Sequence, residues 1–324
     1  MVEKQITHEQ IIAPVKDDLA RLETLMIACA DGYHQDLIAA VEHIISSGGK
    51  RIRPAISFLV GRIYDLEQTR LDTLAASIEM LHTATLVHDD LIDGSLLRRG
   101  SPTLNASWSP AATVLTGDFL FAKAAEFAAA TDSPRLLKKF AQTLSTIVNG
   151  ELNQIFMSKG LLSREDYYTR IYAKTASLLE LCTSSPAILA ENEDHIILLE
   201  KFGRKIGMAF QIVDDILDFV SDESDLGKPI ASDLKQGLFT LPTIYYFEQN
   251  PDNELVQKVL HGNASDEEMF KVFQAIKDSN AVSDALAEAR QEITESLEIL
   301  DKLNLGEEDQ ILRDVAAYII NREF

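Results

Sequence analysis

Six aspartates form two identical motifs, each spelling Asp-Asp-x-x-Asp within otherwise apolar sequence. The first motif stands in HDDLIDG and the second in VDDILDF. Residues four apart in a helix share a face, and like charges at that spacing destabilise the helix by about 0.2–0.5 kcal/mol. A compensating cation is therefore expected at each motif. The six residues are Asp89, Asp90, Asp93, Asp214, Asp215 and Asp218.

The ligand type at these motifs favours a hard cation. Mg²⁺ takes one or two carboxylates and completes its shell with water and substrate phosphate. The calcium-binding EF-hand pattern is not matched, so a calcium sensor is not favoured. An acidic, solvated helix face is the plain alternative for either motif alone, because acidic residues are usually exposed. Two identical motifs in apolar sequence favour Mg²⁺ bridging the carboxylates to a diphosphate.

Basic residues gather in two short segments, GGKRIRP and RRG. In the first, Lys50 and Arg53 precede Pro54, a residue suited to the first turn of a helix. A helix N-terminus with free amides and adjacent cations binds anions. In the second, Arg98 and Arg99 follow the first acidic motif, and guanidinium groups bind phosphate through two parallel hydrogen bonds. These segments predict small anionic ligands.

The whole chain is acidic, with 51 Asp and Glu against 30 Lys and Arg and a net charge of −21. Such a chain is repelled by nucleic acid and by anionic lipid, so no nucleic-acid partner is expected. Its two cysteines, Cys29 and Cys182, argue against a disulfide framework and fit a reducing compartment. No long apolar run or secretory signal is present, so no integral membrane segment is expected. The cytoplasm is the expected location.

Helical sequence dominates the chain. Glycine and proline are sparse, at 15 and 9, and good helix formers are abundant. No Asn-Gly or Asp-Gly turn joins two alternating runs, so strands are not expected. Apolar residues recur at helical spacing over Leu71–Leu97 and around 112–130, 135–158, 164–190, 194–220 and 281–301. Loops are expected at 46–49, 100–110 and Ser221–Gln236. The prediction is one all-α domain over residues 1–324.

Several segments, taken together, resemble the trans-isoprenyl (polyprenyl) diphosphate synthase family. They are GGKRIRP, IEMLHTATLVHDDLIDGSLLRRGSPT, GDFLFAKA, YAKTASLLE, FGRKIGMAFQIVDDILDF and LGKPIASDLKQGLFTLP. They occur in the family's order and span most of the chain. The resemblance implies an orthogonal bundle of helices around a central cavity, with the two acidic motifs facing each other. It also implies a homodimer and dependence on three Mg²⁺ ions.

Matching positions carry the family's roles onto this chain. All six aspartates would bind Mg²⁺. The allylic diphosphate would be held by Arg98, Lys174, Thr175, Gln211 and Lys228. Isopentenyl diphosphate would be held by Lys50, Arg53, His82 and Arg99. The catalytic residues would be Asp89, Asp90, Asp93, Arg98, Lys174, Asp214 and Lys228. The roles of His82, Thr175 and Gln211 rest on the resemblance alone.

The implied reaction suits these groups. Breaking an allylic C–O bond places charge on the departing diphosphate, so catalysis is chiefly stabilisation of that leaving group. The double bond of isopentenyl diphosphate would attack the allylic cation, and a proton would pass to the released diphosphate. No side chain is required as a general base. One departure is Leu238, which stands where many family members have a lysine that contacts diphosphate.

Small residues before the first acidic motif predict a long product. One helical turn rises about 5.4 Å, close to the length of one isoprene unit. Ala84 and Thr85 lie just over one turn before Asp89, where an aromatic residue would block the cavity early. Further down, Leu81 and Met80 could narrow the tunnel. Because HTATLVHDD is similar to long-chain members such as the heptaprenyl and octaprenyl diphosphate synthases, a heptaprenyl-like product for quinone side chains is expected, from a farnesyl or geranylgeranyl primer.

Other functions stay open at this point. A short-chain farnesyl or geranylgeranyl diphosphate synthase would share the motifs. A class I terpene cyclase also uses Mg²⁺, but its second motif mixes Asn, Ser or Thr with Glu, and it needs no GGKRIRP segment. A non-enzymatic acidic helical interaction protein would bind no diphosphate. Within the favoured reading, a small accessory subunit could be required, and the product could bring transient membrane contact.

Overall fold

The computed structural model describes residues 6–98, 100–156, 163–220 and 232–321. Helices make up nearly all of this part of the chain, as the sequence predicts. The centre of the bundle is α10 (Ser177–Leu189), in which every residue is buried. It packs against α11 (Glu193–Val220), α4 (Ile52–Ile63) and α8 (Pro134–Phe156). A helix buried on all sides is expected to be apolar or small all round. α10 fits this except at Glu180, whose carboxylate pairs with Lys139 of α8 at 2.6 Å.

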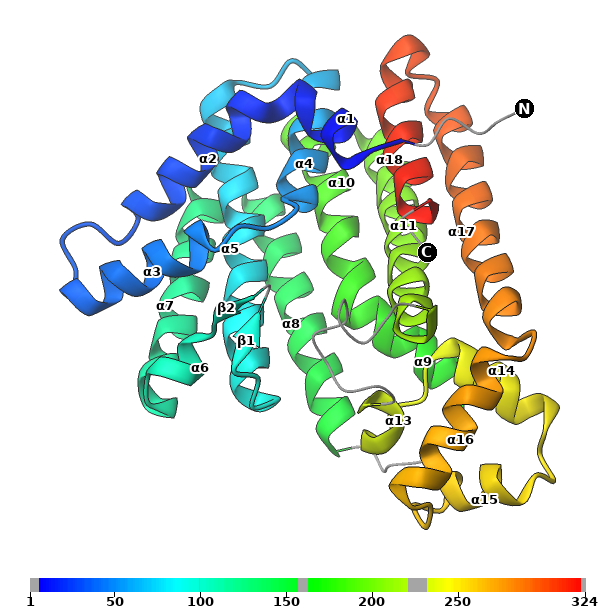
Figure 1. Cartoon of the computed structure of the whole chain (residues 1–324). Helices are drawn as coiled ribbons and strands as arrows, with labels where there is room; N and C mark the ends of the chain where they lie inside the picture. Colours follow the sequence, from blue (N-terminus) through cyan, green and yellow to red (C-terminus); the bar gives the residue numbers. More distant parts are fainter. Residues whose placement is uncertain (1–5, 99, 157–162, 221–231, 322–324) are drawn as a thin grey trace.

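Two long helices flank this centre and carry the acidic motifs. On one side α5 (Gln68–Ile92) packs along α7 (Pro110–Ala129), and on the other α11 packs along α17 (Ala281–Leu303). Figure 1 shows that α5, α8 and α11 run in the same general direction, from the upper to the lower end of the bundle, with α10 between α8 and α11. Because each acidic motif lies at the C-terminal end of its helix, the shared direction brings both motifs to that end.

The remaining elements cover the bundle. The N-terminal cover is α1 (His8–Ile12), η1 (Ala13–Val15), α2 (Lys16–Ala28) and α3 (Gln35–Ser46). Between α8 and α10 lie α9 (Arg164–Ile171) and η2 (Tyr172–Ala176), the latter a π-helical turn. The C-terminal part contains α13 (Ser232–Gln236), α14 (Leu241–Gln249), α15 (Glu254–Leu260), α16 (Asp266–Lys277), η3 (Gly306–Asp309) and α18 (Gln310–Ile320).

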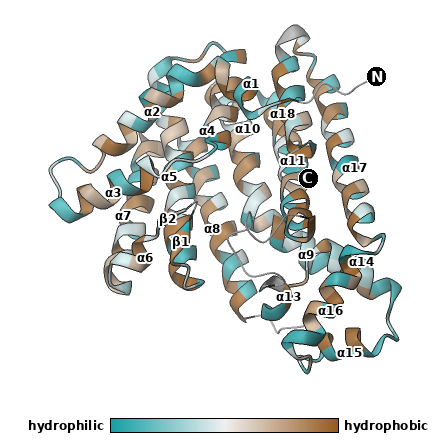
Figure 2. Ribbon diagram, viewed as in Figure 1, coloured by the Kyte–Doolittle hydropathy of each residue, from teal (hydrophilic) through white to brown (hydrophobic). Residues whose placement is uncertain are grey.

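The buried apolar residues form two clusters. The larger joins α4, α5 and α10 to the N-terminal helices and α18, and the smaller joins the lower part of α11 to α14, α16 and α17. Figure 2 shows the matching pattern, with hydrophobic ribbon concentrated inside the bundle and hydrophilic ribbon on outer helices such as α17. None of the helices in the described ranges combines the length and apolar character needed to cross a membrane.

Some boundaries predicted from the sequence were wrong. The helix expected to reach Leu97 ends at Ile92, and the expected loop at 100–110 contains secondary structure. There β1 (Leu97–Arg98) pairs antiparallel with β2 (Ser101–Pro102), and α6 (Leu104–Ser107) follows. These strands have two residues each, too few for an alternating pattern to reveal. Residues 232–236 of the last expected loop form α13, and 221–231 lie outside the described residues.

Candidate active site

The first acidic motif occupies the C-terminal end of α5. Asp89 and Asp90 lie in its last turn and Asp93 is the C-cap. Gly94 follows with φ +65°, a left-handed conformation that ends the helix and sends the chain back toward β1. The three carboxylates differ in exposure, because Asp90 is buried, Asp89 half-buried and Asp93 exposed. The motif therefore presents Asp89 and Asp93 outward and turns Asp90 toward the protein.

Asp90 is bound by Arg98 of the returning hairpin. The Arg98 Nε donates to both carboxylate oxygens at 2.9 Å, and Nη2 donates to Oδ1 at 2.7 Å. The Arg98 side chain stays 38% exposed, whereas that of Asp90 is only 9% exposed. Charge-assisted, two-pronged pairs of this kind fix the plane of the guanidinium group. Arg98 is thus held at the end of α5 with part of its surface available to a ligand.

Asp89 lies in a different environment. Burial raises the pKa of Asp89 to about 6, an effect that nearby Lys174 opposes and that Glu151 and Asp93 reinforce. Lys174 forms an ion pair with Glu151 of α8, with 3.1 Å between Nζ and Oε1. Although burial lowers the pKa of Lys174, the carboxylates of Glu151 and Asp89 raise it above its ordinary value. Sequence reasoning missed Glu151, because a single glutamate in an amphipathic helix carries no motif.

The π-helical turn η2 connects the first acidic motif to the second. Its Lys174 faces the charges around Asp89, and the next residue, Thr175, donates from Oγ1 to Oε1 of Gln211 at 2.6 Å. Gln211 in turn donates to Oδ1 of Asp215 at 2.8 Å. The Tyr167 hydroxyl donates to the other oxygen of Asp215, also at 2.8 Å. Tyr167 was not predicted from the sequence, because its partner lies on a distant element.

The close approach of η2 to α11 depends on Gly207. A Cβ atom at that position would lie 2.5 Å from the Cα of Ala176, closer than packed atoms approach. Turns with π geometry occur often at functional sites because they shift side chains relative to a regular helix. Packing against a glycine thus fixes the turn that carries Lys174 and Thr175.

In the second motif, the middle aspartate is again the most buried. Asp215 is 8% exposed, and Asp214 and Asp218 are half-buried. Within the described ranges, no three His, Cys, Asp or Glu side chains lie together closely enough to hold a metal ion unaided. Lys228 and Arg99, both predicted to bind diphosphate, lie outside the described residues. The metal roles of all six aspartates stay predictions.

The basic segment GGKRIRP lines a cavity of about 230 Å³, together with α5 and α18. Lys50, Arg53 and His82 all contribute to its wall, as do Phe210 and Tyr318. The Nη1 of Arg53 donates to Nε2 of His82 at 3.2 Å. The Nε of Arg53 is buried and has no hydrogen-bond partner among the described residues. A half-buried guanidinium group with a buried, unused donor suits an anionic ligand.

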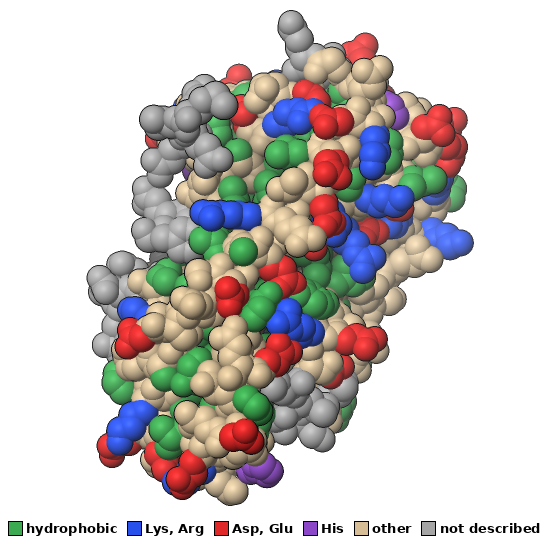
Figure 3. All heavy atoms as spheres, turned by 90° about the vertical axis from the view of Figure 1, so that its right-hand side faces the viewer, with side chains coloured by type: hydrophobic (Ala, Val, Ile, Leu, Met, Phe, Trp, Pro, Cys, Tyr) green, Lys and Arg blue, Asp and Glu red, His purple; other side chains and the backbone are tan. Residues whose placement is uncertain are grey.

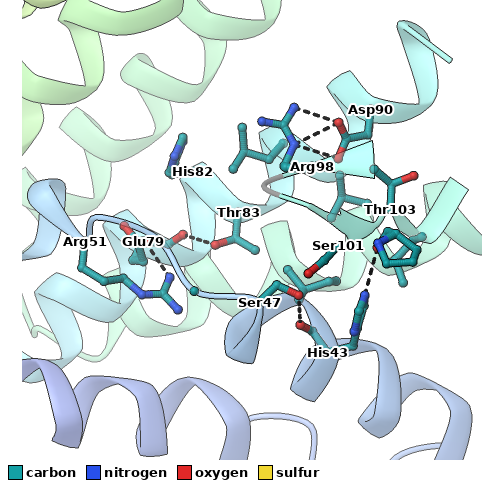
Figure 4. A pocket seen from close by; sticks show the side chains of 16 residues that line it. His43, Ser47, Arg51, Glu79, His82, Thr83, Asp90, Arg98, Ser101 and Thr103 are labelled. Atoms are coloured by element: carbon teal, nitrogen blue, oxygen red, sulfur yellow. Dashed lines mark hydrogen bonds and ion pairs between the residues drawn. The ribbon is translucent and has the colours of Figure 1, made fainter. Parts of the chain in front are cut away.

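A second, smaller cavity of about 70 Å³ lies beside the first and shares Arg51, Glu79 and His82 with it. Figure 4 shows this cavity with the Arg51–Glu79 pair at one end and the Arg98–Asp90 pair at the other. The same face of α5 therefore supplies the partners of both arginines. The structure brings three of the predicted isopentenyl diphosphate residues, Lys50, Arg53 and His82, to one cavity.

The residues predicted to set chain length differ in exposure. Met80, Leu81 and Ala84 are fully buried. Thr85 is half-buried, and its hydroxyl donates to the carbonyl of His82 at 2.7 Å. The small side chain of Thr85 is thus the nearest of the four to open space. Ala84 contributes to the closely packed interior of the bundle.

The surface charge on the α17 side is mixed. Figure 3 shows acidic and basic side chains interspersed over that face. Lys205, for example, pairs with Glu292 and Glu295 at 3.1 and 2.6 Å. Among the described residues, this face carries no continuous basic stripe of the kind that follows a phosphate backbone.

Comparison with known proteins decides the family. The family model for polyprenyl synthetase matches residues 34–277. This chain belongs to the polyprenyl synthetase family. The heptaprenyl diphosphate synthase component 2 of Geobacillus stearothermophilus is 38% identical over 316 residues, covering 96% of this chain and 97% of that protein. The resemblance inferred from the sequence is confirmed.

Solved structures of polyprenyl synthetase relatives have the same fold. Heptaprenyl diphosphate synthase from Staphylococcus aureus is 32% identical with a TM-score of 0.89, covering 96% of this chain and 99% of that one. A polyprenyl synthase from Caulobacter crescentus CB15, solved with calcium and isoprenyl diphosphate, is 29% identical with a TM-score of 0.90. The match covers 99% of this chain and 100% of that one. This polyprenyl synthetase is a transferase with the all-α isoprenoid synthase fold.

Proposed function

We propose that this polyprenyl synthetase condenses isopentenyl diphosphate onto an allylic diphosphate to make a long-chain all-trans polyprenyl diphosphate. A farnesyl or geranylgeranyl primer and a heptaprenyl-like product for quinone side chains are proposed. The observation that carries the proposal is the η2 turn, in which Lys174 and Thr175 join the surroundings of both acidic motifs. The heptaprenyl relative, similar over nearly its whole length, supports the long product.

Mg²⁺ suits the ligands at these motifs. The pKa of Asp89 is raised to about 6 by burial, so a cation beside it would stabilise its charged form. Among the described residues no three His, Cys, Asp or Glu side chains lie together closely enough to hold a metal ion, so water and diphosphate would complete the shell of an ion bound here. That pattern is typical of Mg²⁺. All six aspartates stay the predicted ligands of three ions. Within this set we propose Asp89, Asp93, Asp214 and Asp218 as the main ligands, because Asp90 and Asp215 also hold Arg98 and Gln211 in place.

The protein's own groups account for binding and leaving-group stabilisation. When bound, Mg²⁺ supplies positive charge at the oxygens of the departing diphosphate. Arg98 and Lys174 are held at the acidic motif, where they would bind the same group, with Lys228 as a further predicted contact. Lys50, Arg53 and His82 would bind isopentenyl diphosphate in the adjoining cavity, with Arg99 as a further predicted contact. The released diphosphate would accept the proton.

A homodimer is part of the proposal. Exposed apolar residues follow one face of α8 at helical spacing: Val148, Leu152, Ile155 and Phe156. On the neighbouring α7, Leu115 is 68% exposed. An apolar stripe of this extent favours a protein partner, and the family resemblance implies a second copy of the chain. The Geobacillus relative is named component 2 of a heptaprenyl diphosphate synthase. A complex with a different, accessory subunit is therefore the alternative to a homodimer. Analytical ultracentrifugation of the purified chain, alone and as Leu152→Asp, distinguishes the two.

The proposed location is the cytoplasm, with transient membrane contact while the long apolar product leaves. Incubation of the purified chain with Mg²⁺, an allylic diphosphate and labelled isopentenyl diphosphate tests the function. Incorporation of label into a polyprenyl product supports the proposal. Binding of both diphosphates without incorporation would point to a missing partner subunit, and binding of neither would contradict the proposal.

A further inference from the structure

Arg51 occupies an unusual backbone position inside the GGKRIRP segment. It is the N-cap of α4, with φ +46° and ψ 30°, and no side chain in the described part of the chain caps the helix there. The left-handed region is unfavourable for any residue with a Cβ atom. Arg51 also stands between Lys50 and Arg53, the two residues of the segment proposed to bind isopentenyl diphosphate. Some contact must hold the chain in this conformation.

The Arg51 side chain supplies that contact. It is only 12% exposed and joins the loop to three helices. Nη1 donates to Oε1 of Glu79 on α5 at 2.7 Å. Nη2 donates to the Ile45 carbonyl on α3 at 2.7 Å and to Oε1 of Glu23 on α2 at 3.2 Å. A planar guanidinium group can make these contacts together, whereas a lysine ammonium on the same path cannot match the geometry.

Glu79 is the buried partner, with a side chain 6% exposed. It precedes His82 by three residues on α5, so both project on neighbouring parts of one helix face. Glu79 and Arg51 line the cavity that also contains Lys50, Arg53 and His82. They line the smaller cavity shown in Figure 4 as well, and so form part of the wall between the two. A carboxylate at this wall would repel a diphosphate unless Arg51 neutralised it.

We propose that Arg51 and Glu79 are positioning residues for the isopentenyl diphosphate site. The pair fixes the loop to α5, so that Lys50 and Arg53 of the loop and His82 of α5 face one cavity. Arg51 also cancels the charge of Glu79 next to the bound diphosphate. Neither residue needs to contact the substrate. The inference rests on the proposed function, because it takes isopentenyl diphosphate as the ligand of this cavity.

The two effects predict an unusual order of binding strength. Arg51→Gln releases the loop and leaves the Glu79 carboxylate uncompensated. We expect it to raise both the Kd and the KM for isopentenyl diphosphate by about tenfold or more. The double variant Arg51→Gln with Glu79→Gln removes the repulsive charge, so it should bind more tightly than Arg51→Gln alone. Such non-additivity is the signature of a direct pair. Arg51→Lys keeps the positive charge but loses the planar guanidinium group. Its affinity for isopentenyl diphosphate should lie between that of the unsubstituted chain and that of Arg51→Gln.

The test measures isopentenyl diphosphate binding by calorimetry, KM for each substrate, and Tm, on the full chain. Arg135→Gln is the matched control, because Arg135 makes an exposed pair with Glu193 away from the cavity. The inference predicts that KM for the allylic diphosphate changes by less than about twofold in every variant. Equal loss of both substrates, or unchanged isopentenyl diphosphate binding by Arg51→Gln, would overturn it. If the unsubstituted chain binds neither diphosphate, the proposed function fails as well.

Discussion

Lys174 and Thr175 are adjacent in one π-helical turn, yet they serve different acidic motifs. Lys174 pairs with Glu151 and acts on the charge of Asp89, whereas Thr175 donates a hydrogen bond to Gln211, which in turn holds Asp215. In a regular helix, neighbouring side chains diverge by about 100°. The turn η2 contacts the surroundings of both α5 and α11 through these two side chains, and so couples the geometry of the two motifs.

Gly207→Ala should disturb this coupling. The added Cβ would meet the Ala176 Cα at 2.5 Å and push η2 away from α11. We expect a folded protein that is less stable by about 1–3 kcal/mol, as is usual for overpacking. We also expect kcat/KM to fall by more than about tenfold, because Lys174 and Thr175 shift relative to the motifs. Ser145→Ala, on the exposed face of α8, is the control. Unchanged kcat/KM in Gly207→Ala would show that the turn does not set the site geometry.

The two acidic positions at the end of α5 should behave differently when amidated. Asp89→Asn removes a proposed Mg²⁺ ligand, so Mg²⁺ affinity and activity should both fall by more than the roughly 10–100-fold that loss of a group behind the ligands produces. Asp90→Asn removes instead the partner of Arg98, and groups that orient a site typically contribute about 10–100-fold. Its KM for the allylic diphosphate should rise while Mg²⁺ affinity changes less. Titration of each variant with Mg²⁺ in the presence of a diphosphate checks this. If Asp89→Asn and Asp90→Asn lost Mg²⁺ affinity equally, both residues would be metal ligands.

Bulky substitutions in α5 should separate a tunnel position from a packing position. Thr85 is half-buried, so Thr85→Phe should be accommodated and shorten the product. Ala84 is fully buried, so Ala84→Phe should lower stability by about 1–3 kcal/mol through overpacking. Chromatography of the products and thermal unfolding of both variants provide the measurements. A full-length product from Thr85→Phe would place the tunnel on another face of α5.

Much of this architecture was predictable because its sequence signals are local. The long helices carrying the two motifs follow from apolar spacing. The predicted range 194–220 matches α11 closely, whereas the helix predicted to reach Leu97 ends at Ile92. The contacts of Glu151 and Tyr167 were not predictable, because each pairs with a residue on another helix and belongs to no motif. The π turn was missed for a similar reason. Its geometry depends on packing against Gly207, which nothing within YAKTA itself indicates.

The two cysteines should be poorly reactive in the folded protein. Burial raises the pKa of Cys29 to about 11 and that of Cys182 to about 12, from an ordinary value of 9.0. Since the thiolate is the reactive form, Ellman's reagent should label both slowly near pH 8 and rapidly after unfolding. Rapid labelling of Cys182 in the folded chain would contradict its burial.

The same shifts give stability a defined pH dependence. The folded state keeps both thiol protons to a higher pH than the unfolded state does. The contribution of the two protonated thiols to the free energy of unfolding is therefore fully present below about pH 9. It is lost as the pH rises toward 11 for Cys29 and 12 for Cys182. The free energy of unfolding should fall across that window, and less steeply in Cys182→Ala. Denaturant melts at a series of pH values measure the slope, and an identical slope in Cys182→Ala would contradict the assignment.

The most direct test of the central claim is the length of the product made by the purified chain. Farnesyl diphosphate, radiolabelled isopentenyl diphosphate and Mg²⁺ are supplied, and the products are separated by chromatography. The account predicts a ladder ending at a long, heptaprenyl-like chain, which disappears with chelator or with Asp89→Ala. A ladder that stops at farnesyl or geranylgeranyl length would contradict the long-chain assignment. If both substrates bind but the label stays in isopentenyl diphosphate, catalysis by this chain alone would be contradicted.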